Sequence, residues 1–212
     1  MAHLKPKSLK IARTALLGLT LSVGLSACVK DQAIGGPVPE VGFQHLAKIQ
    51  LNVAEVNVKS NYKGRMQSPN VEHRFITSPE RAMFDWALTR LVATGGKDYP
   101  AIADFVIEDA SVLEVKIEKT EGFKAMFTYE PTTRYDANAV ATFSIKNPVN
   151  GASGNVRIAA KRSIEVSENA TLAEREQVWM TLVESLMADF NAQMDVQIQG
   201  YMARWVATPG LQ

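Results

Sequence analysis

The sequence is poor in the residue types that most often mark a catalytic or metal site. It holds one cysteine, Cys28, and three histidines in 212 residues. A single thiol cannot form an intrachain disulfide, and zinc sites built on cysteine normally use at least two cysteines at short spacing. The chain also contains no HExxH motif and no GxSxG nucleophile elbow. These absences exclude a disulfide framework and leave no motif for a zinc peptidase or an α/β-hydrolase.

The chain also lacks an apolar run long enough to cross a bilayer. Its clearest run, TALLGLTLSVGL at 14–25, has 12 residues. As a helix it would span about 18 Å, against about 30 Å for the hydrocarbon core. Four basic residues and no acidic residue precede it, and the small residues Ser26 and Ala27 follow. This order of basic, apolar and small residues predicts a signal peptide at 1–27.

The four residues Leu25, Ser26, Ala27 and Cys28 resemble the lipobox of bacterial lipoproteins. The resemblance implies that Cys28 receives a diacylglyceryl group on sulfur, that the leader is cut before it, and that the new amine is acylated, with palmitate as a typical chain. It further implies the periplasmic face of the outer membrane as the location, because Val29 rather than aspartate follows the cysteine; the inner membrane is the alternative. A buried structural cysteine after an ordinary secretory signal is the other interpretation of these residues.

The mature chain would have one domain of ordinary size. Removal of 1–27 leaves 185 residues with 19 basic and 22 acidic side chains, a net charge of −3. This mild acidity gives no support for nucleic acid as a partner. Residues 28–42 are the lipidated cysteine and a Gly- and Pro-containing tether, 43–206 the domain, and 207–212 a tail.

The first half of the domain predicts a strand and a helix. Residues 48–58 alternate between apolar and polar in two opposite phases, which predicts one strand with a bulge near Ala54. A helix should follow over 78–96, with Ser78 as N-cap, Pro79 at the first position and glycines at the exit.

The second half predicts strands followed by a long helix. Segments 103–118, 135–145 and 155–166 alternate with period two, and 123–129 is a possible fifth strand. Thr171 and Glu174 form a capping-box pattern, and an apolar stripe runs from Trp179 to Trp205. A helix of 36 residues would measure about 54 Å, longer than the about 40 Å of a compact domain, so we expect a bend near 191–200 or an overhanging end.

This order of elements predicts an α+β two-layer sandwich, with a mostly antiparallel sheet of four or five strands and two helices on one face. It resembles the lipopolysaccharide-assembly lipoproteins of the LptE type and the auxiliary lipoproteins of ABC-type lipid transporters. The resemblance implies a non-enzymatic auxiliary or assembly factor with an envelope protein as partner. It implies no particular binding residues.

Few residues suggest a site. Glu72 and His73 are a possible acid/base or metal pair, but neighbours on an extended segment point apart, and a surface or packing role is the plainer interpretation. Arg134 and Asp136 are expected to form a solvated ion pair. One apolar cluster is expected to contact a partner protein or an acyl chain, and a role in the core is the alternative. The cluster consists of Phe123, Met126, Phe127 and Tyr129.

The sequence therefore favours a membrane-anchored, non-enzymatic lipoprotein of the cell envelope that needs no cofactor and no metal. A lipoprotein enzyme with hydrolase-like activity on envelope substrates, resting on Glu72 and His73, is one alternative. A purely structural envelope module is the other.

Overall fold

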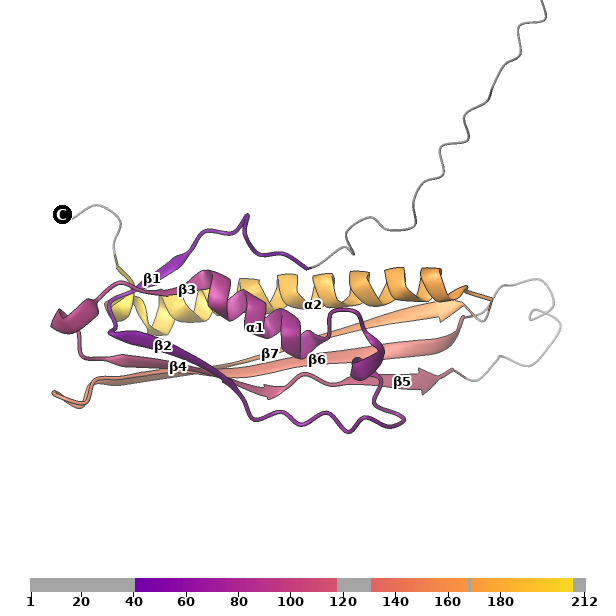
Figure 1. Cartoon of the computed structure of the whole chain (residues 1–212), viewed down its shortest axis with the longest axis horizontal. Helices are drawn as coiled ribbons and strands as arrows, with labels where there is room; N and C mark the ends of the chain where they lie inside the picture. Colours follow the sequence, from indigo (N-terminus) through magenta and orange to yellow (C-terminus); the bar gives the residue numbers. More distant parts are fainter. Residues whose placement is uncertain (1–40, 118–130, 168, 208–212) are drawn as a thin grey trace, which may run out of the picture. The chain divides into compact units, whose positions relative to one another are not determined.

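The computed structural model describes residues 41–117, 131–167 and 169–207. All of them belong to one compact unit, Pro39–Gln212. Within it a five-stranded sheet and a small two-stranded sheet lie with two α-helices (Figure 1).

A β-hairpin contributes the two longest strands of the main sheet. Strand β6 (Pro131–Lys146) pairs antiparallel with β7 (Ser153–Ser167) along its whole length. The other edge of β6 is shared by two strands in turn, β4 (Ile102–Asp109) and β5 (Val112–Lys116), both antiparallel to it. Strand β2 (Glu55–Ser60) adds to β4 in parallel. The sheet is therefore mostly antiparallel, with one parallel pair.

The predicted strand at 103–118 is interrupted where its alternation breaks. Ser111 donates its backbone N–H to the Asp109 carboxylate over 3.0 Å, and Asn138 of β6 donates to the Ser111 hydroxyl over 3.2 Å. The extra residue turns the chain so that both Ile107 and Val112 are fully buried. The Asp109 carboxylate thus satisfies a backbone N–H that the ladder leaves unpaired at the bulge, and the side-chain bond from Asn138 holds the turn to β6.

The prediction of one bulged strand over 48–58 is wrong. Strand β1 (Ile49–Leu51) pairs in parallel with β3 (Leu91–Ala93), whereas β2 belongs to the main sheet. Each of the two apolar phases corresponds to a strand, but the first strand belongs to the small sheet and the second to the main sheet. Residues 205–207 complete the small sheet from the other side: Asn52 donates to Trp205 O over 2.7 Å and Ala207 donates to Gln50 O over 2.9 Å.

Helix α1 (Pro79–Arg90) begins as the sequence predicts and ends earlier. The Ser78 side chain accepts from the Arg81 amide, and Pro79 occupies the first turn. The helix stops at Arg90 rather than at the glycines, because Leu91 enters β3 and pairs with Ile49. The predicted helical end at 96 is therefore wrong, since a tertiary pairing takes the last residues.

Helix α2 (Leu172–Tyr201) has the predicted capping box, with Thr171 and Glu174 each bonded to the other's backbone. It runs as one unbroken helix of 30 residues, six fewer than predicted, so the expected break at 191–200 is absent and the chain passes into η4 after Tyr201. The helix measures about 45 Å, and the 15 residues of β7 measure about 50 Å, so the strand is long enough to support a straight helix. The bend was predicted because the sheet was expected to be no longer than a compact domain of about 40 Å, and the long strand β7 exceeds that length.

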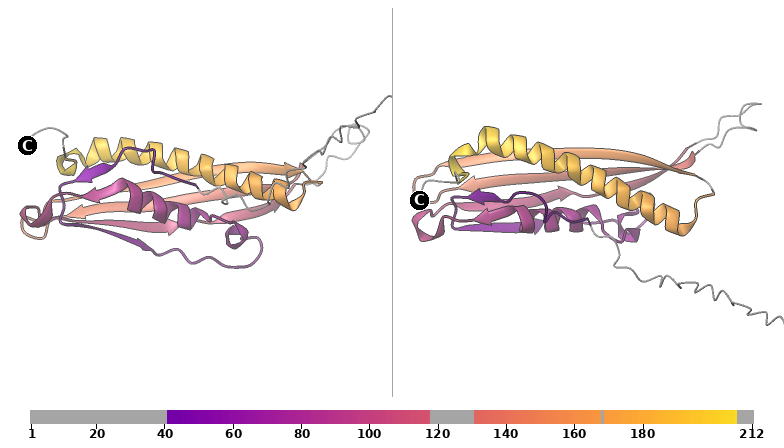
Figure 2. Two further views of the ribbon diagram at one scale, coloured as in Figure 1. Left: turned by 45° about the horizontal axis from the view of Figure 1, so that its top comes forward. Right: turned by 90° about the horizontal axis from the view of Figure 1, so that it is seen from above.

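Both helices cover the same face of the main sheet, as predicted. Helix α2 lies mainly over β7, and α1 lies beside it over β2, β4 and β6 (Figure 2). Apolar residues from both layers form the core, including Trp86, Phe105, Tyr135, Phe143 and Phe190. The α+β two-layer fold is confirmed. The described residues also include the short 3-10 helices η1 (Glu72–Arg74), η2 (Gly96–Asp98) and η4 (Ala203–Trp205).

Among the helices of the described residues, none combines the length and the apolar character that a membrane span requires.

Candidate functional site

The structure separates Glu72 and His73, the pair that the sequence offers as an acid and a base. Both lie in η1, where Glu72 is only 4% exposed and His73 is exposed. Glu72 accepts from the Tyr62 hydroxyl over 2.7 Å and from the Val112 amide over 3.3 Å. Its carboxylate thus fastens the loop of 61–74 to β5, which is a packing role.

The protonation of this carboxylate agrees with that role. Burial alone would raise the pKa of Glu72, but hydrogen bonds from Tyr62, from the backbone and from Asn70 outweigh it, so the pKa lies below its ordinary value. Burial and the neighbouring Glu72 raise the pKa of Tyr62. A general acid or base near neutral pH needs the opposite shift for a carboxyl group. Glu72 is therefore held as a structural anion.

Arg134 and Asp136 form the ion pair that the sequence predicts. Arg134 donates from Nε and from the terminal nitrogen to the two carboxylate oxygens over 2.9 and 3.0 Å, and the Ser163 hydroxyl donates to Asp136 over 2.6 Å. The hydrogen bonds from Arg134 chiefly hold the pKa of Asp136 below its ordinary value. The pair lies on the face of the sheet away from the helices, where it cross-links β6 and β7.

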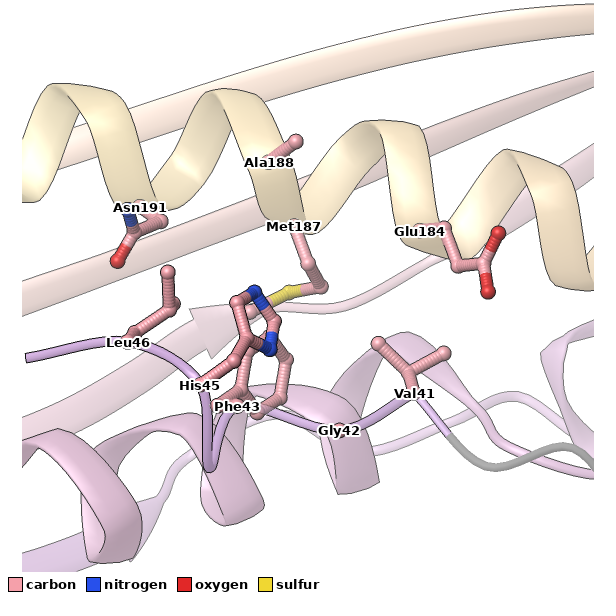
Figure 3. A pocket seen from close by; sticks show the side chains of 9 residues that line it. All are labelled: Val41, Gly42, Phe43, His45, Leu46, Glu184, Met187, Ala188 and Asn191. Carbon is pink, nitrogen blue, oxygen red and sulfur yellow. The ribbon is translucent and has the colours of Figure 1, made fainter.

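The sequence patterns do not predict a cavity that the structure forms beside α2. Residues 41–48, here called the strap, lie beside both helices before the chain reaches β1, since they line one cavity with α2 and another with α1. Between the strap and α2 lies an open cavity of about 330 Å³, here called the strap cavity (Figure 3). Its wall contains Val41, Phe43 and Met187, all buried, and the partly buried Leu46; His45, Glu184 and Asn191 provide polar groups at its edge.

A chain of polar side chains fixes the strap and both helices together. Trp86 of α1 donates its indole N–H to Asn191 of α2 over 2.8 Å, and Asn191 donates to Asp195 over 3.2 Å. Asp195 pairs with Arg90, a residue only 4% exposed, which also donates to the carbonyl of Ala47 in the strap. The strap therefore ends at a buried, hydrogen-bonded cation.

A signal for this network was present in the sequence. Met83, Trp86, Ala87 and Arg90 follow helical spacing, which puts Arg90 on the apolar face of α1. A buried arginine requires a carboxylate or carbonyl partner. The sequence could thus have predicted that Arg90 is paired, but not that its partner lies at Asp195.

Two further expectations concern the apolar cluster at 123–129 and metal binding. The cluster Phe123, Met126, Phe127 and Tyr129 lies in 118–130, outside the described residues, so its predicted contact role stays a prediction. Among the described residues, no group of three or more His, Cys, Asp or Glu side chains is placed to hold a metal ion.

Comparison with known proteins gives similarity at the level of structure only. No protein-family model matches the chain, and no curated protein matches it in sequence. A homologue of the neuraminyllactose-binding hemagglutinin from Helicobacter pylori is 9% identical, with a TM-score of 0.37, and the match covers 71% of this chain and 88% of that one.

Two further solved structures are similar to the chain. A Xanthomonas campestris protein described as DUF330 is 7% identical, with a TM-score of 0.30, over 76% of this chain and 97% of that one. A PelC dodecamer from Paraburkholderia phytofirmans is 14% identical, with a TM-score of 0.23, over 74% of this chain and 90% of that one. These identities and TM-scores are too low for the role of any of these proteins to be transferred.

Proposed function

We propose that the chain is a non-enzymatic lipoprotein of the cell envelope, held by acyl groups on Cys28 at the periplasmic face of the outer membrane. Its domain acts there as an auxiliary or assembly factor for lipid or lipopolysaccharide transport, together with an envelope protein partner. The observation that carries the proposal is the sequence Leu25, Ser26, Ala27, Cys28 directly after a short apolar run.

The start of the described fold agrees with such an anchor. Val41, the first described residue, stands 13 positions after Cys28. A stretch of 13 residues can reach at most about 45 Å even when fully extended, so acyl groups on Cys28 would hold the domain near the lipid surface. Each buried methylene of an acyl chain contributes about 0.8 kcal/mol, and two or more chains give stable attachment.

The geometry supports binding rather than chemistry. Glu72, the carboxylate on which the hydrolase alternative rests, is already bonded to Tyr62 and Val112. The strap cavity has an apolar wall with few polar groups, which is typical of ligand sites.

Pairing of two copies through β7 is disfavoured on steric grounds. No described residue pairs with its outer edge, but α2 lies mainly over this strand. A second β7 would lie about 5 Å away and would bring its own α2 equally close, whereas packed helices need about 8–10 Å. Assembly of a purely structural module through this edge is therefore disfavoured, and an assembly through the sheet face opposite the helices is the form in which that alternative stands.

The proposal is tested on the protein purified from its native membrane. Intact-mass and peptide analysis should find residue 28 as the N-terminus, bearing a diacylglyceryl group and an amide-linked acyl chain. The full-length Cys28→Ser variant should lose membrane attachment that survives a salt wash. An unmodified thiol at Cys28, or a wild-type protein released by salt, would refute the anchor.

A further inference from the structure

The strap cavity has two unlike ends. Along α2 the wall runs from Glu184 through Met187 and Ala188 to Asn191. The strap runs beside it in the same direction, with Val41 near Glu184 and Leu46 near Asn191 (Figure 3). The Asn191 end is fixed by the hydrogen bonds to Trp86 and Asp195. The Val41 end is where the described chain begins, on the side that leads back to Cys28.

The dimensions suit one narrow apolar chain. The seven helical steps from Glu184 to Asn191 span about 10 Å. One leaflet of a bilayer holds hydrocarbon to a depth of about 15 Å, half of the full core. The cavity can therefore take the larger part of one acyl chain, and it is too short for a helix of a partner protein.

The charge at the open end selects a headgroup. Glu184 is exposed and makes no hydrogen bond or ion pair with any other described residue. Asp85, an acidic residue of α1 that also lies near the strap, is already paired with Arg81 over 3.7 Å. A free carboxylate at the mouth repels a purely anionic headgroup and attracts an ammonium.

We propose that the strap cavity binds one acyl chain of a membrane phospholipid whose headgroup carries an ammonium, with that ammonium at Glu184. The inference rests on the proposed function, because an acyl group on Cys28, 13 positions before Val41, would keep the cavity within reach of a bilayer. A bilayer supplies acyl chains at high local concentration, so a shallow site suffices.

The test uses photocrosslinking with the full-length, lipidated protein in phosphatidylglycerol vesicles. The probe is a trace of phosphatidylethanolamine with a diazirine at the end of one acyl chain, and peptide mass spectrometry locates the label. Labels should concentrate in peptides that contain 41–46 and 184–191. Labels spread over the surface in proportion to exposed area would overturn the proposal.

Two variants on one helix give the matched control. Ala188 is exposed and lines the cavity, so Ala188→Trp should fill it and lower the labelling about tenfold. Ala192 is exposed on the next turn and does not line the cavity, so Ala192→Trp should leave the labelling unchanged. Equal labelling of the two variants, with both shown to be folded by thermal melting, would refute the site.

The headgroup is tested by a second probe, phosphatidylglycerol with the same diazirine. Glu184→Gln should lower the ratio of ethanolamine to glycerol labelling about threefold, as expected for loss of one exposed charge pair. Glu176→Gln, on the same helix and outside the cavity lining, is the control. An unchanged ratio in Glu184→Gln would refute the assignment of the ammonium.

The same preparation separates this inference from the proposed function. The probe lipid is a separate molecule, so its labelling does not require an acyl group on Cys28, whose modification is read from the intact mass. Labelling at the cavity with an unmodified Cys28 would refute the anchor alone. A lipidated Cys28 without labelling at the cavity would refute the lipid site alone.

Discussion

Trp86 donates its indole N–H to Asn191 Oδ1 over 2.8 Å, although the two residues lie 105 positions apart in the chain. Trp86 is fully buried, and its ring also meets that of Phe190 edge-on at 5.3 Å. A polar contact inside an apolar layer has a fixed geometry. It therefore sets how far α2 slides along α1, which apolar packing alone would not do.

Replacement of Asn191 tests this contact. Asn191→Leu removes the acceptor and leaves the Trp86 N–H buried without a partner, so the free energy of unfolding should fall by about 1–3 kcal/mol. Urea unfolding followed by tryptophan fluorescence measures it. Gln193→Leu, an exposed change two positions away, should alter stability little. Equal stability of the two variants would contradict the role of Asn191.

Two ion pairs of different burial should respond differently to loss of a carboxylate. Asp195→Asn leaves the charge of Arg90, whose side chain is 5% exposed, without its counterion and should cost about 3 kcal/mol. Asp189→Asn breaks a pair with Arg162, whose side chain is 48% exposed, and should cost at most about 1 kcal/mol.

Thermal unfolding at low and high salt measures both changes. The small effect of Asp189→Asn should shrink further at 1 M salt, where the screening length is about 3 Å, whereas that of Asp195→Asn should persist. Similar costs for the two variants would show that Arg90 is hydrated rather than buried with Asp195.

Glu72 should contribute to stability in a pH-dependent way. Because its pKa in the folded protein lies below the ordinary value of 4.5, its stabilising effect is fully present above that value and is lost as the pH falls through the folded pKa. Glu72→Gln should lower the free energy of unfolding at pH 7 by about 1–2 kcal/mol, because it replaces strong hydrogen bonds to a charged carboxylate by weaker bonds to a neutral amide.

Denaturant midpoints measured between pH 7 and pH 3 should therefore converge for wild type and Glu72→Gln as the pH falls. Asp136, whose pKa is also lowered, keeps some acid sensitivity in both proteins. Parallel curves over the whole range would contradict the assignment.

Two glycines should give changes of opposite sign when replaced by alanine. A Cβ on Gly154 would lie 2.5 Å from the ring of Trp205, which is only 6% exposed, so Gly154→Ala should destabilise by about 1–3 kcal/mol. A Cβ on Gly200 meets nothing within 4 Å. Because Gly200 lies inside α2, Gly200→Ala should stabilise by about 0.5–1 kcal/mol. Melting temperatures of the two variants on either side of wild type would confirm the packing of Trp205.

Local patterns predicted much of this fold because local chemistry determines those parts. Ser78 and Thr171 begin their helices by accepting backbone N–H groups within the same turn. The alternation in β6 and β7 follows from a sheet covered on one face. Arg162 breaks that alternation, and its side chain pairs with Asp189 of the covering helix, so even the exception has a local cause.

The errors arose where a distant partner decides the outcome. Leu91 leaves α1 because Ile49 pairs with it, and residues 48–58 divide between two sheets for the same reason. The strap cavity was missed because its two walls are separated by more than a hundred residues and neither carries a motif. The lipobox, by contrast, is a contiguous pattern, and its role stays a prediction until Cys28 is examined.

The antiparallel bridge between Leu51 and Val206, with the Asn52–Trp205 and Ala207–Gln50 hydrogen bonds beside it, has a mechanical consequence. Tension that arrives through Val41 would load the buried side chains of Val41 and Phe43, then the contact between Ala47 and Arg90, and then β1. There the backbone bonds on both sides of the strand bear the load together in shear, rather than opening one after another. The fold is thus built to resist traction from the side on which an anchor would pull.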